Sequence, residues 1–286
     1  MGKVAIVTGG GDGIGYGIAT SLAQDGYDLA LWDIRADVGQ AGAKKLTAEY
    51  GVRTLAVTTD VAKANQVEAA IKATVDGLGV PYLLVNNAGI TRIGRMEDVS
   101  LADWQAVLDV NLTGVFLCTQ AAGRHMLAAR EGVIVNIASV SALTPQVYRP
   151  GYSPTKAGVV ALTQVTALEW GPRGVRCNAV SPGQVWTSHS AAVYAIPEMY
   201  EERRRQVPLK RIAEATEMGS AIVFLASSAA SYVNGVNLVV DGGLHLTMQG
   251  RMPTMGPEGV VVRPEEMYTE PTKGPQGGSQ VGTASR

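Results

Sequence analysis

Cysteine and histidine are scarce in this chain of 286 residues, which contains two cysteines and three histidines. Cys118 lies in an apolar helical stretch and Cys177 in a strand-like one, and neither belongs to a CxxC or Cys/His cluster. The histidines show no metal-ligand spacing. The sequence therefore predicts two buried thiols, no disulfide framework, no metal site, and a reducing compartment.

The chain also lacks an excess of charge of either sign. It has 24 Lys and Arg against 25 Asp and Glu, which gives a formal net charge of -1. A nucleic-acid-binding surface normally requires a strong basic bias, so this composition argues against such partners. We expect small-molecule partners.

Long hydrophobic runs are missing as well. No uninterrupted apolar run reaches the ~20 residues that a helix needs to span a bilayer. The apolar run Val4-Ala5-Ile6-Val7 begins three residues after the start, which leaves no room for the basic and apolar regions of a signal peptide. We therefore expect no membrane segment and a cytoplasmic protein.

Short apolar runs are what the chain does have, and helical segments separate them. Because they are nearly continuous in Val, Ile, Leu and Ala, we expect strands covered by helices on both faces, as in a parallel sheet. Ile14, Ile18 and Leu22 repeat every four residues and predict an apolar helix face between the first two runs. The sequence predicts an α/β fold, a single Rossmann-like doubly wound domain over residues 1–248 with a seven-stranded parallel sheet. The seven runs are Val4 to Val7, Asp28 to Trp32, Thr54 to Val57, Tyr82 to Val85, Val133 to Ile137, Arg176 to Val180 and Asn237 to Val240.

Two segments depart from this rhythm. Residues 188–208 interrupt it before the last run, and we interpret them as a short, helical substrate lid inserted over the strand ends. Residues 249–286 contain 12 Gly and Pro among 38 positions, a composition typical of tails outside the core. We treat them as a separate C-terminal extension.

A glycine-rich turn follows the first predicted strand and opens the first predicted helix. Gly9, Gly13 and Gly15, with Asp12 and Ile14 between them, suit a tight turn that brings backbone N–H groups close to a pyrophosphate. The helix N-terminus then faces the anion. Glycines also make ordinary turns, but strand, turn and helix occur here in the order that a dinucleotide site requires.

Asp33 ends the second predicted strand, about twenty residues after the glycines, where a carboxylate can accept hydrogen bonds from the adenosine ribose. It would repel a 2′-phosphate, neither Gly10 nor Gly11 is basic, and Arg35 alone is a poor substitute. NAD is therefore favoured over NADP, although Asp33 could be a plain strand-end residue. Asp60, followed by Val61, could meet the adenine amino group or cap a helix.

Tyr152 and Lys156 lie one helical turn apart, and Ser139 precedes the tyrosine by thirteen positions. A phenol titrates near ~10, so it is a poor base at neutral pH unless a neighbouring cation favours the phenolate. The spacing puts a proton carrier and a cation on one helix face. Ser141 is a rival for Ser139.

These residues resemble the short-chain dehydrogenase/reductase family from about Gly2 to Leu246. The matching motifs are TGxxxGxG at Thr8 to Gly15, NNAG at Asn86-Asn87-Ala88-Gly89, an asparagine at Asn111, a serine at Ser139, YxxxK at Tyr152 to Lys156, a PG turn at Pro182-Gly183 with Thr187 beyond, and the closing segment Val240-Asp241-Gly242-Gly243.

The resemblance implies a role for each of these residues. Lys156 would hydrogen-bond the nicotinamide ribose and lower the pKa of Tyr152, Ser139 would hold the substrate oxygen, and Asn111 would anchor a water that links Lys156 to solvent; Asn111 could instead mark a helix kink. The resemblance also implies a homotetramer. The further cofactor contacts that it implies are Asn87, Ala88, Gly89, Pro182, Gly183, Val185 and Thr187.

Substrate contacts are expected from Ser139 and Tyr152 and from the residues around them, Ser141, Gln146, Arg149 and Gln184. Arg149, Arg92, Arg95 and the run Arg203 to Arg205 raise the hypothesis of a hydroxylated or anionic substrate held by guanidinium groups. The alternative, that these arginines are simply solvated, stays open.

Together these features predict an NAD-dependent oxidoreductase that interconverts a secondary alcohol and a ketone of a sugar, polyol or related metabolite. A 3-oxoacyl thioester reductase is the alternative enzyme, which Asp33 disfavours because such reductases mostly use NADPH. A nucleotide-sensing regulator on the same fold is a third possibility, but such proteins commonly lose the tyrosine or the lysine.

Overall fold

The structure, a computed structural model, describes residues 2–247, 254–255 and 261–262. By its internal contacts the chain divides into two units, Met1–His245 and Leu246–Arg286. In the second unit, β8 (Thr254–Met255) pairs with β9 (Val261–Val262) in antiparallel fashion. The rest of the predicted extension 249–286 lies outside the described residues.

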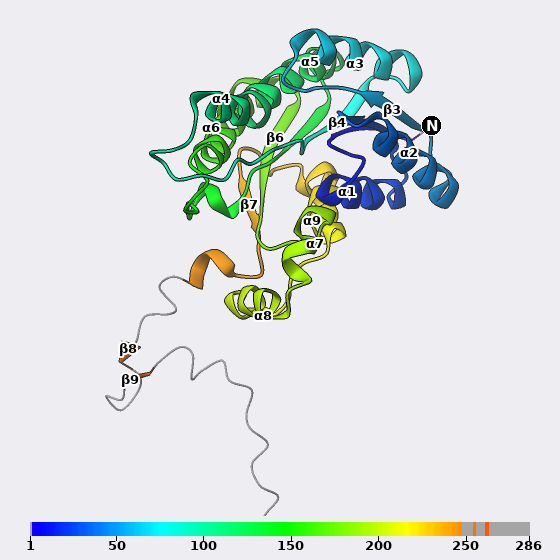
Figure 1. The fold of residues 1–286 in the computed structure, drawn as a ribbon. Helices are drawn as coiled ribbons and strands as arrows, with labels where there is room; N and C mark the ends of the chain where they lie inside the picture. The colour runs from blue at the N-terminus through cyan, green and yellow to red at the C-terminus, as the bar shows by residue number, and fades with distance from the viewer. Residues whose placement is uncertain (1, 248–253, 256–260, 263–286) are drawn as a thin grey trace, which may run out of the picture. The chain divides into compact units, whose positions relative to one another are not determined.

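The first unit is built on a seven-stranded sheet in which every pairing is parallel, in the order β3-β2-β1-β4-β5-β6-β7 (Figure 1). The predicted Rossmann-like α/β fold is confirmed, and each predicted apolar run forms a strand. The strands are β1 (Val4–Thr8), β2 (Asp28–Asp33), β3 (Thr54–Thr58), β4 (Pro81–Asn86), β5 (Gly132–Ile137), β6 (Val175–Pro182) and β7 (Asn237–Val240).

Helices cover both faces of this sheet, with α1, α2 and α9 on one face and α3, α5 and α6 on the other (Figure 1). Short 3-10 turns lie at Val140–Ala142, Gly171–Arg173, Ser228–Ala230 and Leu244–Leu246. The helices are α1 (Gly13–Gln24), α2 (Ala36–Tyr50), α3 (Ala64–Gly77), α4 (Leu101–Leu108), a π-helical turn (Asp109–Thr113), α5 (Gly114–Ala129), α6 (Tyr152–Trp170), α7 (Ser188–Tyr194), α8 (Pro197–Gln206) and α9 (Ala215–Ala226).

Successive strand residues pack in two separate core layers, one on each face of the sheet. Val7 packs in the layer that contains Ile18 of α1 and Ile222 of α9, whereas its neighbour Ile6 packs in the layer that contains Met126 of α5. Alternate side chains of a strand point to opposite faces, so a strand that is buried on both faces must be apolar throughout. This requirement explains the continuous apolar runs in the sequence.

The two predicted buried thiols are confirmed. Cys118 and Cys177 are both buried and free, as expected, and burial raises the pKa of each to about 12.

The continuous helical stretch Leu101–Ala129 is long and apolar enough to cross a membrane by length and composition alone, which was not predicted from the sequence. Half of its most apolar part is buried inside the unit, and α5 packs there against β4 and β5.

The segment that interrupts the strand rhythm is helical, as predicted, and forms α7 and α8. An aromatic cluster joins the two helices to the end of β6: the ring of Trp186 stacks on Tyr194 at 5.1 Å between centroids, and Tyr200 packs edge-on against both.

Candidate active site

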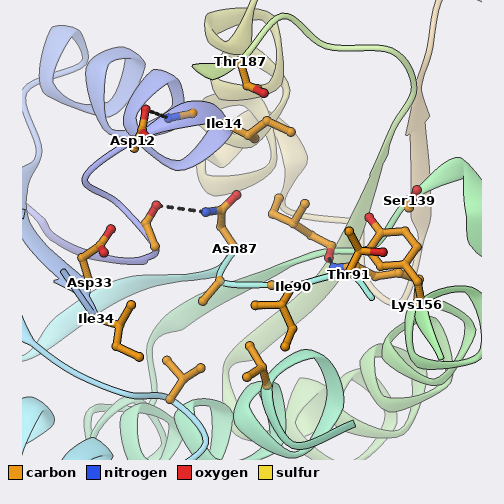
Figure 2. A pocket seen from close by; sticks show the side chains of 18 of the residues that line it. Asp12, Ile14, Asp33, Ile34, Asn87, Ile90, Thr91, Ser139, Lys156 and Thr187 are labelled. Carbon is orange, nitrogen blue, oxygen red and sulfur yellow. Dashed lines mark hydrogen bonds between the residues drawn. The ribbon is translucent and has the colours of Figure 1, made fainter. Parts of the chain in front are cut away.

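A cavity of about 690 Å³ opens at the carboxyl ends of the strands, beside β1. In the sheet β1 lies between β2 and β4, and the chain crosses from one side of β1 to the other between β3 and β4. Ligands of open α/β sheets bind at this switch point. Figure 2 draws many of its lining residues and labels ten of them. Most predicted site residues line the cavity. They are Gly9, Asp12, Gly13, Ile14, Asp33, Asp60, Val61, Asn87, Ala88, Gly89, Ser139, Arg149, Tyr152, Lys156, Pro182, Gly183 and Thr187.

The glycine turn leaves no room for side chains at its critical positions. A Cβ on Gly15 would clash with the carbonyl oxygen of Gly9 and with Nδ2 of Asn87. Gly9 itself has φ +61°, a left-handed conformation that glycine adopts at little cost. Asp12 caps α1 by accepting a 2.7 Å hydrogen bond from the N–H of Gly13. The turn and the helix N-terminus therefore form a bare backbone cradle that fits a pyrophosphate.

Asn87 ties this cradle to the end of β4. Its Nδ2 donates to the carbonyl oxygens of Thr8 at 2.9 Å and Gly9 at 3.2 Å, and Figure 2 shows this amide directed at the glycine turn. The backbone N–H groups of Asn87 and Ala88 donate to Oγ1 of Thr8. The side chain predicted to contact the cofactor is thus committed to holding the glycine turn in place.

At the end of the cavity predicted to hold adenosine, the buried carboxylate of Asp33 is fixed by two backbone donors. The N–H of Gly11 donates to Oδ2 at 3.1 Å, and the N–H of Arg35 donates to Oδ1 at 3.0 Å. A Cβ on Gly11 would lie 3.0 Å from Oδ2 of Asp33, and one on Gly10 would lie 2.8 Å from the carbonyl oxygen of Val7. A basic side chain at either glycine would require the turn to shift.

Asp60 lies in the cavity wall, and its Oδ1 accepts a 3.0 Å hydrogen bond from the N–H of Ala62. The helix cap considered for Asp60 is wrong, because α3 begins at Ala64 with Lys63 as its N-cap residue. Asp60 closes a local turn ahead of the helix, because an aspartate readily bonds the N–H two residues further on.

Ser139, Tyr152 and Lys156 converge at the other end of the cavity. Ser139 begins the turn after β5 and hydrogen-bonds both the N–H of Ser141, at 3.1 Å, and the hydroxyl of Tyr152. Lys156 is buried, and its Nζ donates to the carbonyl oxygen of Ile137 at 2.7 Å and lies 5.7 Å from the centre of the Tyr152 ring. Ser139 lines the cavity, whereas its rival Ser141 does not.

The expectation that Lys156 lowers the pKa of Tyr152 is not met, because the pKa of this phenol is raised. Burial is the largest influence on this phenol and raises its pKa, while the hydrogen bond from Ser139 and the charge of Arg149 lower it. Burial also lowers the pKa of Lys156 to about 8. Both shifts have one physical cause, because a group taken out of water favours its neutral form.

Asn111 is fully buried in the π-helical turn between α4 and α5. Its Oδ1 accepts from the N–H of Ile90 at 2.8 Å, and its Nδ2 donates to the carbonyl oxygen of Ile90 at 2.9 Å. The amide thus holds the loop after β4, which carries the cavity residues Ala88 and Gly89, and does not itself line the cavity. The irregular helix agrees with the kink interpretation.

Five other predicted residues also lie away from this cavity: Gly15, Ser141, Gln146, Gln184 and Val185. Val185 is buried in the core. Oε1 of Gln184 accepts from the hydroxyl of Tyr194 and from Nη1 of Arg203, both at 3.0 Å. Gln146 lines a second hollow, formed by residues 95–97 and 146–150, that shares Arg149 with the main cavity.

Several cavity residues were not predicted from the sequence, notably Ile34, which Figure 2 shows next to Asp33, and Ile90, which it shows further along the wall near Thr91. Ile34 is 65% exposed, and an apolar residue directly after a strand-end carboxylate was the available signal. Oγ1 of Thr91 is a buried atom without a hydrogen-bond partner among the described residues. It offers a polar contact for a bound molecule.

Nothing in the sequence marked Thr91 apart from its place after the NNAG motif.

Within the described residues, no group of three or more His, Cys, Asp or Glu side chains could hold a metal ion.

Comparisons with known proteins find relatives with similar sequences and folds. The sequence model of a family described as Enoyl-(Acyl carrier protein) reductase matches residues 9–245. D-threitol dehydrogenase of Mycolicibacterium smegmatis is 41% identical over 242 residues, which cover 85% of this chain and 92% of the relative. A 3-oxoacyl-[acyl-carrier-protein] reductase of Staphylococcus epidermidis is 36% identical over 247 residues, which cover 86% of this chain and 100% of the relative.

Among solved structures, one from Agrobacterium tumefaciens superposes with a TM-score of 0.77 at 35% identity, over 85% of this chain and 96% of the other. It is described as a candidate 2-deoxy-d-gluconate 3-dehydrogenase and contains bound NADP.

Proposed function

This chain belongs to the short-chain dehydrogenase/reductase family, and on that premise we propose that it is an NAD-dependent enzyme that interconverts a secondary alcohol and a ketone. Its relatives act on CH–OH groups, so an oxidoreductase is the function class that they share. The observation that carries the proposal is the convergence of Ser139, Tyr152 and Lys156 on the same cavity as the glycine cradle.

The residues of the cavity fit a nicotinamide dinucleotide along its length. The cradle at Gly9 and Gly13 would hold the pyrophosphate, Asp33 the adenosine ribose, and Lys156 the nicotinamide ribose. Asp60, Val61, Ala88, Gly89, Pro182, Gly183 and Thr187 would complete the binding site. When bound, NAD supplies the acceptor for the hydride that leaves the carbinol carbon.

Tyr152 would move the proton of the reaction. In the oxidation direction, its phenolate oxygen takes the proton of the substrate hydroxyl, and in the reduction direction the phenol returns that proton. The hydroxyl of Ser139 would donate a hydrogen bond to the substrate oxygen and keep it within reach of Tyr152. Lys156, in its ammonium form, would favour the phenolate once a bound ligand completes the site.

NAD is proposed over NADP because the carboxylate of Asp33 is fixed where the adenosine ribose would lie and would repel a 2′-phosphate. The tight contacts at Gly10 and Gly11 support this preference, since neither position has space for a basic side chain. A similar solved structure contains bound NADP, so the two cofactors must be compared directly. Initial rates with the two cofactors at equal concentration, over a panel of secondary alcohols, test both the activity and the preference.

The proposed substrate is a sugar, polyol or similar hydroxylated metabolite, and the similarity to D-threitol dehydrogenase supports this class. Arg149 lines the cavity and its charge reaches Tyr152, which favours substrates that also carry an anionic group. Neutral polyols compared with sugar acids, before and after Arg149→Ala, test this point. Unchanged relative rates would remove Arg149 from the proposal.

The runner-up is a 3-oxoacyl thioester reductase, which the similarity to the Staphylococcus epidermidis enzyme and the description of the matching family model favour. Reduction of a 3-oxoacyl thioester with NADPH, faster than any alcohol oxidation with NAD, would select it. A nucleotide-sensing regulator is disfavoured because the cavity keeps both Tyr152 and Lys156.

We further propose residues 1–248 as the catalytic domain, 188–208 as its substrate lid, and 249–286 as a separate extension. A homotetramer is proposed because α5 and α6 leave Phe116, Val165 and Leu168 exposed on their surfaces. Light scattering tests this assembly. A cytoplasmic location is proposed from the two free, buried cysteines.

A further inference from the structure

The adenosine end of the cavity holds one guanidinium between two carboxylates. Nη2 of Arg35 lies 3.3 Å from Oδ2 of Asp12, and Nε of Arg35 lies 3.8 Å from Oδ1 of Asp33. Asp12 comes from the glycine turn, and Asp33 and Arg35 come from the end of β2 and the loop after it. Figure 2 shows Asp12 and Asp33 on the same side of the cavity.

Asp12 is a fixed partner in this arrangement. Its Oδ1 caps α1 through the N–H of Gly13, while Oδ2 receives Arg35, and Ser188 at the start of the lid adds a third hydrogen bond. Burial, the largest single influence, raises the pKa of this carboxyl, but the hydrogen bonds and the charge of Arg35 together lower it. The carboxylate is therefore ionised at neutral pH.

Arg35 is the only basic side chain at this end, among the described residues that line the cavity. Arg92 pairs with Asp103 at 3.3 Å, and Lys156 bonds Ile137. Arg149 lies near Tyr152, at the opposite end. A phosphate on the adenosine ribose would carry about -1.5 to -2 charges and would need Arg35 as its counter-ion.

We propose that Asp12 is a cofactor-specificity residue, which pairs with Arg35 and so withholds the guanidinium from the 2′-phosphate that distinguishes NADP from NAD. This inference rests on the proposed function, in which Asp33 meets the adenosine ribose. To bind a 2′-phosphate, Arg35 must leave Asp12, and the phosphate must then lie near two carboxylates with a single cation. Binding of NAD requires neither change, because NAD has no 2′-phosphate.

The test measures dissociation constants of NADH and NADPH from the fluorescence of the reduced nicotinamide, which needs no knowledge of the substrate. Asp12→Asn is the informative variant because asparagine caps a helix as well as aspartate does while it removes the charge. The ratio of the NADPH constant to the NADH constant should fall about three- to ten-fold, the order expected for freeing one partly exposed ion pair to meet a phosphate.

Two companion variants identify the cause. In Asp12→Asn/Arg35→Ala the ratio should return to the wild-type value, because the released guanidinium is gone. Asp37→Asn removes a carboxylate from an exposed position two residues after Arg35 and should leave the ratio unchanged.

An unchanged ratio in Asp12→Asn overturns the inference, and so does a fall that persists in the double variant or occurs equally in Asp37→Asn. A wild-type protein that binds NADPH as tightly as NADH is a different result. It would refute the cofactor preference of the proposed function, while the response of Asp12→Asn to Arg35→Ala would still decide the role of Asp12.

Discussion

The ammonium of Lys156 donates a 2.7 Å hydrogen bond to the carbonyl oxygen of Ile137, the last residue of β5. This is the one protein hydrogen bond of Nζ among the described residues, although an ammonium has three donors to satisfy. The side chain is 3% exposed, and burial lowers its pKa from 10.5 to about 8. Burying this cation at the proposed site therefore lowers the free energy of unfolding.

Replacing this cation should stabilise the fold and abolish turnover. Lys156→Met is expected to raise the free energy of unfolding at pH 7 by roughly 2 kcal/mol, because the pKa shift from 10.5 to about 8, at ~1.4 kcal/mol per pKa unit, outweighs the lost hydrogen bond of about 1 kcal/mol. Denaturant unfolding measures the gain. Lys44→Met, which removes an exposed lysine from α2, is the matched control and should change little.

The stability gain should also depend on pH. Between the folded pKa of about 8 and the ordinary value of 10.5, the unfolded chain binds a proton that folded Lys156 has released. Wild-type stability therefore gains a contribution as pH rises through this range, and Lys156→Met lacks it. The difference between the two proteins should shrink from pH 8 to pH 10; a constant difference would mean that the buried ammonium is not its source.

Tyr152→Phe should lower turnover by roughly 10²- to 10⁴-fold, the range that general acid–base groups supply. NADH binding should persist, because the phenol oxygen is not part of the glycine cradle. Tyr148→Phe, which removes an exposed hydroxyl from the preceding loop, should keep its activity. Initial rates and NADH fluorescence separate the two effects, and a fully active Tyr152→Phe enzyme would refute the assignment.

The sheet could be predicted from sequence because a strand buried on two faces must be apolar throughout. Most predicted ends were short by one or two residues, and in several strands the residues that continue them are polar, such as Thr8, Asp33 and Asn86. Backbone ladder bonds decide these ends, and they leave no apolar signature.

The site could be predicted as a set of positions, but not as a set of contacts. Motifs identified Asn87 and Asn111, and Gln184 was expected to contact substrate, yet each of these amides hydrogen-bonds a partner inside the protein. Such ties depend on where loops from distant parts of the sequence meet. The predicted direction of the Tyr152 pKa shift was wrong for a related reason. Burial raises this pKa, and burial depends on the fold and not on the spacing of two residues.

Gly15→Ala tests the cradle without removing any polar side chain. The new Cβ would meet the carbonyl oxygen of Gly9 and the amide of Asn87, so the turn must open, and NADH affinity should fall at least about ten-fold with a loss of stability. Gly77→Ala in α3 is the control, since its Cβ would meet only the flexible end of Leu55 at 3.3 Å. Retained NADH affinity in Gly15→Ala would show that the close packing is dispensable for binding.

Gln184 is expected to position the lid, because its Oε1 joins β6 to Tyr194 of α7 and to Arg203 of α8. Gln184→Leu leaves a buried phenol and a guanidinium without their acceptor, a loss of about 1–3 kcal/mol in the stability of the closed lid. We expect faster trypsin cleavage at the arginines of α8 and a several-fold higher KM, with a smaller change in kcat.

Gln184→Glu separates positioning from a direct substrate contact. Its carboxylate can accept from both donors and pairs with the charge of Arg203, so it should restore the wild-type cleavage rate and KM. If Gln184 instead bound substrate through its amide N–H groups, Gln184→Glu would restore trypsin resistance but not KM. Equal trypsin rates in Gln184→Leu and the wild type would show that the lid does not depend on this residue.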